Sequence, residues 1–265
     1  MKKLYISADI EGVCGIVDWA ETEIAEAQGA YFRAQMTREV QAACEAAAAA
    51  GVEEIFVKDA HGSGRSIDPS ALPRNARLMR AWTRDPFSMM AGIDPGYGAA
   101  MLIGYHSGAG SDGNPLAHTM NTDNVRLLVN GLEASEFLLN AYTAASFGVP
   151  VVLVSGDRKL CEHAASIDPR IATVAVSEGF GNASVSINPA LAVERIKDAA
   201  AAVLRAGAFA PFALPKRFDV TIEFRHHFRA YRGSFYPGAV RSSTLAVSYS
   251  CSEWMDALKF LFFVL

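Results

Sequence analysis

Two carboxylates follow the first apolar run of the chain, and they are the first side chains that could hold a cation. The run covers residues 4–8 and leads into Asp9 and Glu11, with Gly12 directly behind them. Side chains alternate along a strand, so residues two apart point to the same side. Two buried carboxylates are costly unless a positive partner lies between them. The pair therefore predicts a metal ion at the carboxyl end of this strand.

Two further apolar runs end in potential metal ligands. Residues 54–58 lead into Asp59 and His61, and residues 100–105 lead into His106. If the strands are parallel, their carboxyl ends share one edge of a sheet. Carboxylate and imidazole without thiolate suit zinc or another divalent first-row ion, and two such ions would need a bridging carboxylate. The candidate metal ligands are Asp9, Glu11, His61, His106 and Glu136.

Each of these residues has a simpler explanation when it is taken alone. A histidine at a strand end is usually solvated or hydrogen-bonded, and Glu136 would suit the first turn of a helix. The joint pattern favours the metal site. His118, which follows a Gly-rich loop, is the candidate catalytic residue because an imidazole exchanges protons near neutral pH. Asp157 also ends an apolar run and is a candidate for orienting a ligand.

The elements that must position these residues predict an α/β fold. An Ala-rich stretch, residues 27–50, has helical composition and lies between the first two strands, which gives a right-handed βαβ unit. We expect a mostly parallel sheet flanked by helices in three layers. Further strands are predicted at 77–79, 100–105, 126–130, 150–155 and 172–176, and further helices at 133–147, 159–166 and 189–206.

Prolines and Gly207 near residue 210 predict a boundary between two domains. Residues 1–210 would form the metal-binding catalytic domain. Residues 211–265 would form a smaller α+β domain with strands near 218–224 and 243–250 and a closing helix from about Ser252. We expect this second domain to serve substrate access and oligomer contacts.

Composition excludes several classes of protein. The 265 residues include 24 basic and 28 acidic side chains, without a basic stripe, so nucleic acid is not an expected partner. The four cysteines are widely spaced, which fits a reducing compartment. No apolar run is long enough for a signal peptide or a membrane span, so we expect a cytoplasmic protein. The Gly-rich loop lacks a P-loop lysine and a dinucleotide fingerprint, which argues against nucleotide binding.

Five motifs, in order and at similar spacing, resemble the zinc-dependent D-aminopeptidases associated with bacterial dipeptide-transport operons. The motifs are Asp9-x-Glu11-Gly12, Asp59-x-His61, Gly104-Tyr105-His106, His118-Thr119-Met120 and Glu136 with Asn140-Ala141. The C-terminal part resembles the family at Ile222-Glu223-Phe224, Pro237-Gly238 and Thr244. The resemblance covers most of the chain.

The resemblance implies a binuclear zinc site. Asp9 would bridge both metals, Glu11 would hold one, and His61, His106 and Glu136 would hold the other. His118 would match the family's proposed nucleophile. The resemblance also implies a ring of ten subunits and substrates with an N-terminal D-amino acid, such as D-Ala-D-Ala.

Two departures from the family lie near the expected substrate. Ser135 stands where the family usually has Gly, and the loop between His106 and His118 is about one residue longer. Both concern stereospecificity more than metal binding.

The predicted activity is metal-assisted removal of the N-terminal residue from short peptides. From chemistry alone, His118 could act as general acid, general base or nucleophile. The alternatives are an L-aminopeptidase, a binuclear phosphoesterase and a non-catalytic peptide-binding scaffold. A phosphoesterase should place Arg or Lys near its site, and the candidate stretches offer only Lys58 and Arg65.

Overall fold

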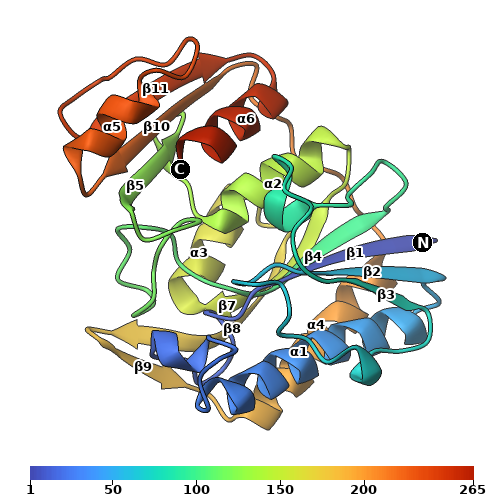
Figure 1. Ribbon diagram of the computed structural model, residues 1–265. Coiled ribbons are helices and arrows are strands. Elements are labelled where there is room, and N and C mark those ends of the chain that lie inside the picture. Colours follow the sequence, from blue (N-terminus) through green and yellow to red (C-terminus); the bar gives the residue numbers. More distant parts are fainter.

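A seven-stranded sheet forms the centre of the computed structural model, which describes residues 1–265 (Figure 1). Its strand order is β3-β2-β1-β4-β7-β8-β9, and every neighbouring pair is parallel except β8 and β9. The prediction of a mostly parallel sheet is confirmed. The strands are β1 (Lys3–Ala8), β2 (Glu54–Asp59), β3 (Ala76–Met79), β4 (Ala99–Tyr105), β7 (Val151–Asp157), β8 (Ala172–Phe180) and β9 (Ala183–Ser186).

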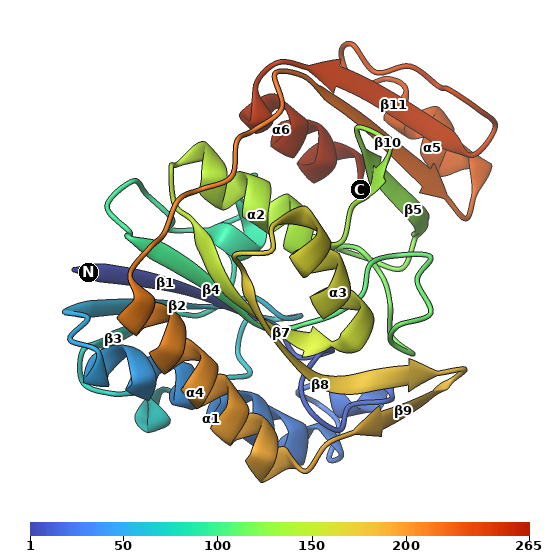
Figure 2. The same ribbon diagram turned by 180° about the vertical axis from the view of Figure 1, so that it is seen from behind.

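Helices cover both faces of this sheet, as Figures 1 and 2 show. One face packs against α1 (Gly29–Ala49) and α4 (Pro189–Ala206), and the other packs against α2 (Glu136–Ser146) and α3 (Arg158–Ile167). Side chains along β1 point alternately to the two faces of the sheet. Leu4 and Ile6 therefore lie in the core with α1 and α4, whereas Tyr5 lies in the core with α2. The predicted three-layer arrangement is therefore present.

A second, antiparallel sheet lies beside α2, with the order β11-β10-β5-β6. It joins two C-terminal strands to two strands from the middle of the chain, so residues beyond 211 do not form this sheet alone. The predicted domain boundary at residue 211 stays a prediction. The elements are β5 (Asn124–Val129), β6 (Leu132–Glu133), β10 (Phe218–Phe224) and β11 (Ala246–Cys251), together with α5 (His227–Gly233) and α6 (Trp254–Val264).

Most predicted elements are found within a few residues of their expected bounds, including the closing helix α6. Four further features were not expected from the sequence: β6, β9, α5 and the short 3-10 turns. Those turns are η1 (Trp19–Glu21), η2 (Pro69–Ala71) and η3 (Ser88–Met90). None of the helices has the length and apolar character that crossing a membrane would require.

Candidate metal centre

The six residues predicted to carry the chemistry lie together at the carboxyl edge of the parallel sheet. They come from the ends of β1, β2 and β4, from the loop after β4, and from the first residue of α2. Five of the side chains are buried, and His118 is nearly so. The six residues are Asp9, Glu11, His61, His106, His118 and Glu136.

Two glycines allow the ends of β1 and β4 to approach each other closely. A Cβ atom on Gly12 would lie 1.7 Å from the carbonyl oxygen of Tyr105, and one on Gly104 would lie 2.4 Å from that of Asp9. Gly104 also has a φ of +72°, which favours glycine. The glycines beside the predicted ligands thus bring Asp9 next to His106.

Asp9 belongs to two groups of potential metal ligands, one on each side of its carboxylate. Its Oδ1 lies 3.3 Å from His61 Nδ1, which lies 3.1 Å from Glu11 Oε2. Its Oδ2 lies 3.5 Å from His106 Nε2, which lies 3.4 Å from Glu136 Oε2. Two ligands of one tetrahedral zinc ion, each about 2.0–2.1 Å from the metal, are about 3.3 Å apart. The donor set therefore fits two zinc ions that share Asp9.

This grouping differs from the division implied by the family resemblance. His61 was expected beside His106 and Glu136, and it lies instead with Glu11. The reason is the strand order, because β1 is flanked by β2 on one side and β4 on the other. Ligands from β2 and β4 therefore reach Asp9 from opposite sides.

His106 gives an independent sign that a cation belongs here. Its Nδ1 lies 2.8 Å from the carbonyl oxygen of Ser107, which can only accept, so Nδ1 carries the proton. Its Nε2 is buried and has no hydrogen-bond partner. A buried imidazole nitrogen that lies between two carboxylates without a hydrogen-bond partner is suited to a metal.

Asp157 holds the segment that carries His106, as the sequence suggested for a supporting role. Its carboxylate accepts hydrogen bonds from the backbone N–H and the hydroxyl of Ser107, each at 2.6 Å. It also accepts one from the backbone N–H of Leu160 at the start of α3. Asp157 therefore holds Ser107, whose carbonyl oxygen orients the His106 ring.

The charges of the cluster shift the pKa of several members. Burial, and then Glu11, raise the pKa of Asp9 well above its usual value. Burial would lower the pKa of His61, but the Glu11 carboxylate raises it to about 11. Burial would raise the pKa of Glu136, but His106 lowers it to about 2. Crowded carboxylates thus recruit protons onto nearby imidazoles, and a bound metal would displace those protons.

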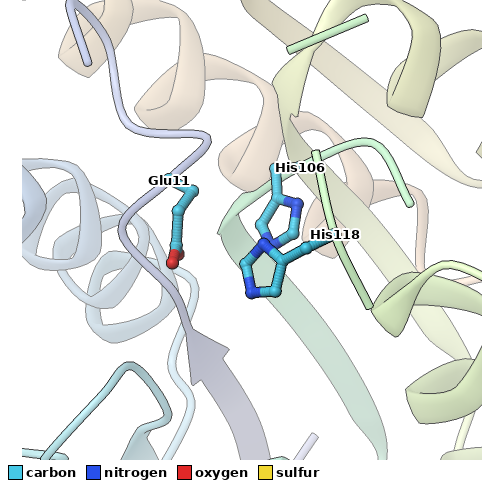
Figure 3. Close-up of side chains that lie close together, drawn as sticks. All are labelled: Glu11, His106 and His118. Atoms are coloured by element: carbon cyan, nitrogen blue, oxygen red, sulfur yellow. The ribbon is translucent and has the colours of Figure 1, made fainter. Parts of the chain in front are cut away.

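His118 lies against the cluster and has one nitrogen directed at it. Its Nδ1 lies 2.9 Å from the carbonyl oxygen of Leu116, which leaves Nε2 as the acceptor, 3.6 Å from Glu136 Oε1. Its ring stacks on His106 with centroids 4.4 Å apart, and these two residues form a third group of potential metal ligands with Glu11, which lies beside them (Figure 3). An acceptor nitrogen held in this way can take up and return a proton.

The cluster opens into a cavity of about 560 Å³, within the usual range for small-molecule sites, roughly 300–1,000 Å³. No Lys or Arg lines it, which disfavours a phosphoester substrate. Four large apolar side chains that the sequence did not single out also line the cavity, two of them in short 3-10 turns and two in loops without periodicity. They are Trp19, Trp82, Met89 and Met120.

Comparisons with known proteins agree over nearly the whole chain. The family model described as D-aminopeptidase, peptidase family M55, matches residues 1–263. A D-aminopeptidase of Bacillus subtilis (strain 168) is 28% identical over 262 residues, which cover 97% of this chain and 94% of that protein. A solved structure, the Zn-dependent D-aminopeptidase DppA from Bacillus subtilis, a self-compartmentalizing protease, has a TM-score of 0.92 and 26% identity. The match covers 99% of this chain and 96% of that one.

Proposed function

The chain belongs to the D-aminopeptidase family M55 and is a metal-dependent aminopeptidase, and on this premise we propose that it is a binuclear zinc enzyme that releases the N-terminal D-amino acid from short peptides such as D-Ala-D-Ala. The observation that carries the proposal is the position of Asp9. Its two carboxylate oxygens face separate ligand groups, as a bridging ligand must. The zinc dependence of DppA, a relative with the same fold, supports the choice of metal.

In this proposal five side chains hold two zinc ions, with Asp9 shared between them. Glu11 and His61 complete one group, and His106 and Glu136 complete the other. Bound zinc supplies a Lewis acid that polarises the scissile carbonyl and lowers the pKa of water toward neutrality. Asp157, acting through Ser107, keeps the His106 ring in the orientation that directs Nε2 at the site.

His118 handles the proton that peptide hydrolysis must move. Its Nε2 accepts a proton from the attacking water and returns it to the amide nitrogen as the C–N bond breaks. The hydrogen bond from Nδ1 to Leu116 keeps the ring in the tautomer that this role needs. A covalent adduct trapped on His118 would decide for nucleophilic attack instead.

The C-terminal unit, residues 211–265, serves substrate access in this proposal. Two polar residues of the cavity wall, Asn121 and Thr122, contact it directly. Arg225 donates to the carbonyl oxygen of Thr122 at 2.7 Å, and Asn121 donates to that of Leu265 at 3.4 Å. The position of the unit therefore sets one side of the cavity mouth.

The proposal extends to assembly and location. A self-compartmentalizing relative supports a homo-oligomer, which we propose to be a ring of ten subunits. The four cysteines are all free, which fits the reducing cytoplasm. Light scattering of the purified protein gives the mass of the assembly, and a monomer would contradict this part.

The test of the activity is hydrolysis of D-Ala-D-Ala beside L-Ala-L-Ala, with and without a chelator, on protein whose zinc content is measured. We expect chelator-sensitive release of D-Ala and two zinc ions per chain. Cleavage of only the L-peptide would keep the binuclear peptidase and overturn its stereospecificity. One zinc per chain with full activity would overturn the binuclear centre.

A further inference from the structure

Trp82 and the preceding residue, Ala81, are held at the wall of the cavity by three hydrogen bonds. The indole Nε1 of Trp82 donates to the carbonyl oxygen of Gly62 at 2.7 Å, directly beside the candidate ligand His61. Ala81 donates its N–H to Gly64 at 2.7 Å and accepts a hydrogen bond from Lys58 Nζ at 2.8 Å. The indole is therefore held in place before any substrate enters.

Lys58 supports Trp82 from outside the cavity. Its side chain is fully buried on β2, yet it pairs with no carboxylate and does not line the cavity. Its ammonium group donates to the carbonyl oxygens of Asp59 and Ala81 and lies 4.1 Å from the centre of the Trp82 ring. A buried lysine with only carbonyl and aromatic partners is expensive to keep. What it holds in place is the Ala81–Trp82 segment.

The backbone of this segment is also strained. Ala81 has a φ of +62° and Arg84 a φ of +65°, in the left-handed region that disfavours residues with a Cβ atom. Such conformations persist where the surrounding structure enforces them, and they concentrate at functional sites. The strained backbone, the buried lysine and the hydrogen bonds all act on the segment that positions Trp82.

We propose that Trp82, positioned by Lys58, is a specificity-determining residue that selects peptides with a large apolar side chain, aromatic ones best, beside the scissile bond; this rests on the proposed peptidase function. The cavity that Trp82 lines has a volume of about 560 Å³. Trp19, Met89 and Met120 line the same cavity as the metal ligands. Indole and thioether groups pack well against aromatic side chains.

The experiment compares D-Phe-Gly-Gly with D-Ala-Gly-Gly, and the corresponding L-peptides, on wild type and Trp82→Ala at measured zinc content. We expect wild type to favour the Phe peptide, and Trp82→Ala to lose about 10- to 30-fold in kcat/KM for that peptide, mainly through KM, because aromatic contact and apolar burial are removed. The Ala peptide should change less than about threefold. Trp82→Phe should keep most of the preference.

Tyr31→Ala, at an exposed aromatic residue of α1 outside the cavity, is the matched control and should change neither peptide. Equal loss on both peptides in Trp82→Ala, or a wild-type preference for the Ala peptide, would overturn the inference. Calorimetric binding of D-phenylalanine amide and D-alanine amide separates the two proposals. Absence of turnover of all the peptides by wild type would overturn the peptidase function. Equal affinity of wild type for the two amides would overturn the role of Trp82 in specificity.

Discussion

The floor and the rim of the cavity are built by different parts of the chain and on different physical principles. The floor is the metal centre, of which five residues line the cavity and the sixth, His106, is buried; its residues come from strand ends, from the loop after β4 and from the start of α2. The rim consists of Trp19, Trp82, Met89 and Met120, which come from loops and short turns. The floor is polar and mostly buried, whereas the rim is apolar and extends from buried Met89 to Trp19, which is 39% exposed.

The floor and the rim each lower the stability of the fold, through different unfavourable terms. In the floor, three carboxylates are buried together, and the cost of desolvating them is offset only by cations. In the rim, the cost lies in positive φ angles and in the buried charge of Lys58. The difference teaches that the floor is organised for reaction at one point and the rim for selection among substrates. Variants of the two regions should therefore fail in different ways.

Removing the charge of Asp9 should have the largest effect, because both ligand groups depend on it. We expect Asp9→Asn to lower kcat/KM for D-Ala-D-Ala by at least about a thousandfold. Zinc content, measured by elemental analysis, should fall together with the activity. Asp198→Asn, at an exposed position on α4, is the matched control. Retention of two zinc ions and near-normal turnover in Asp9→Asn would show that Asp9 is no bridge.

A substitution at His118 tests the catalytic step independently of metal binding. We expect His118→Ala to reduce kcat by about 100- to 10,000-fold, the usual contribution of a general acid–base group. Zinc content should stay at the wild-type level, because both ligand groups that share Asp9 are complete without this residue. His163→Ala on α3, outside the cavity, should leave both quantities unchanged. Loss of zinc from His118→Ala would make it a ligand.

The floor could be predicted from the sequence because its geometry follows from secondary structure. Asp9, His61 and His106 each stand just beyond an apolar run, and parallel strands end at a common edge. What the sequence did not determine was which ligands share a metal. That depends on the spatial order of the strands, in which β1 lies between β2 and β4.

The rim could not be predicted, because its contacts join residues with no periodic relation. Lys58 meets the Trp82 ring across 24 positions of sequence (82 − 58), through a segment whose positive φ angles fall on Gly62, Gly64 and also Ala81. A lysine within an apolar run suggests a solvated face, and only the structure shows it buried against carbonyls. Loop residues such as Trp82 carry no pattern that separates a specificity residue from a surface residue.

Lys58 tests whether the rim acts on selection alone. Lys58→Met keeps the length of the side chain and removes the cation, so the Ala81–Trp82 segment should loosen. We expect about a five- to tenfold fall in the preference for D-Phe-Gly-Gly over D-Ala-Gly-Gly, with little change in zinc content. The double variant Lys58→Met with Trp82→Ala should be no less selective than Trp82→Ala alone, because both act through one indole. Additive losses would mean that Lys58 has another role.

Glu39 is a buried carboxylate outside the floor, away from the candidate metal ligands, and it shows how burial changes the pKa of such a group. It lies fully buried on α1, and one oxygen accepts hydrogen bonds from the backbone N–H of Cys14 and from Gln35, while the other has no partner. Burial raises its pKa to about 7, against the lowering effects of Gln35, Cys14 and Arg38. The folded protein therefore keeps this proton to a higher pH than the unfolded chain, which releases it near pH 4.5.

Because the folded state binds the extra proton between about pH 4.5 and 7, Glu39 should make the protein less stable as pH rises through that window. The shift corresponds to about 3 kcal/mol. Glu39→Gln removes this titration, so its stability relative to wild type should improve by up to that amount between pH 5 and pH 8, with turnover unchanged. Denaturant midpoints at fixed zinc measure the gap, with Glu194→Gln on α4 as the exposed control. If the difference in stability between Glu39→Gln and wild type does not vary with pH, the folded protein stabilises Glu39 as an anion. Burial alone would then not explain why the carboxylates of the floor require cations.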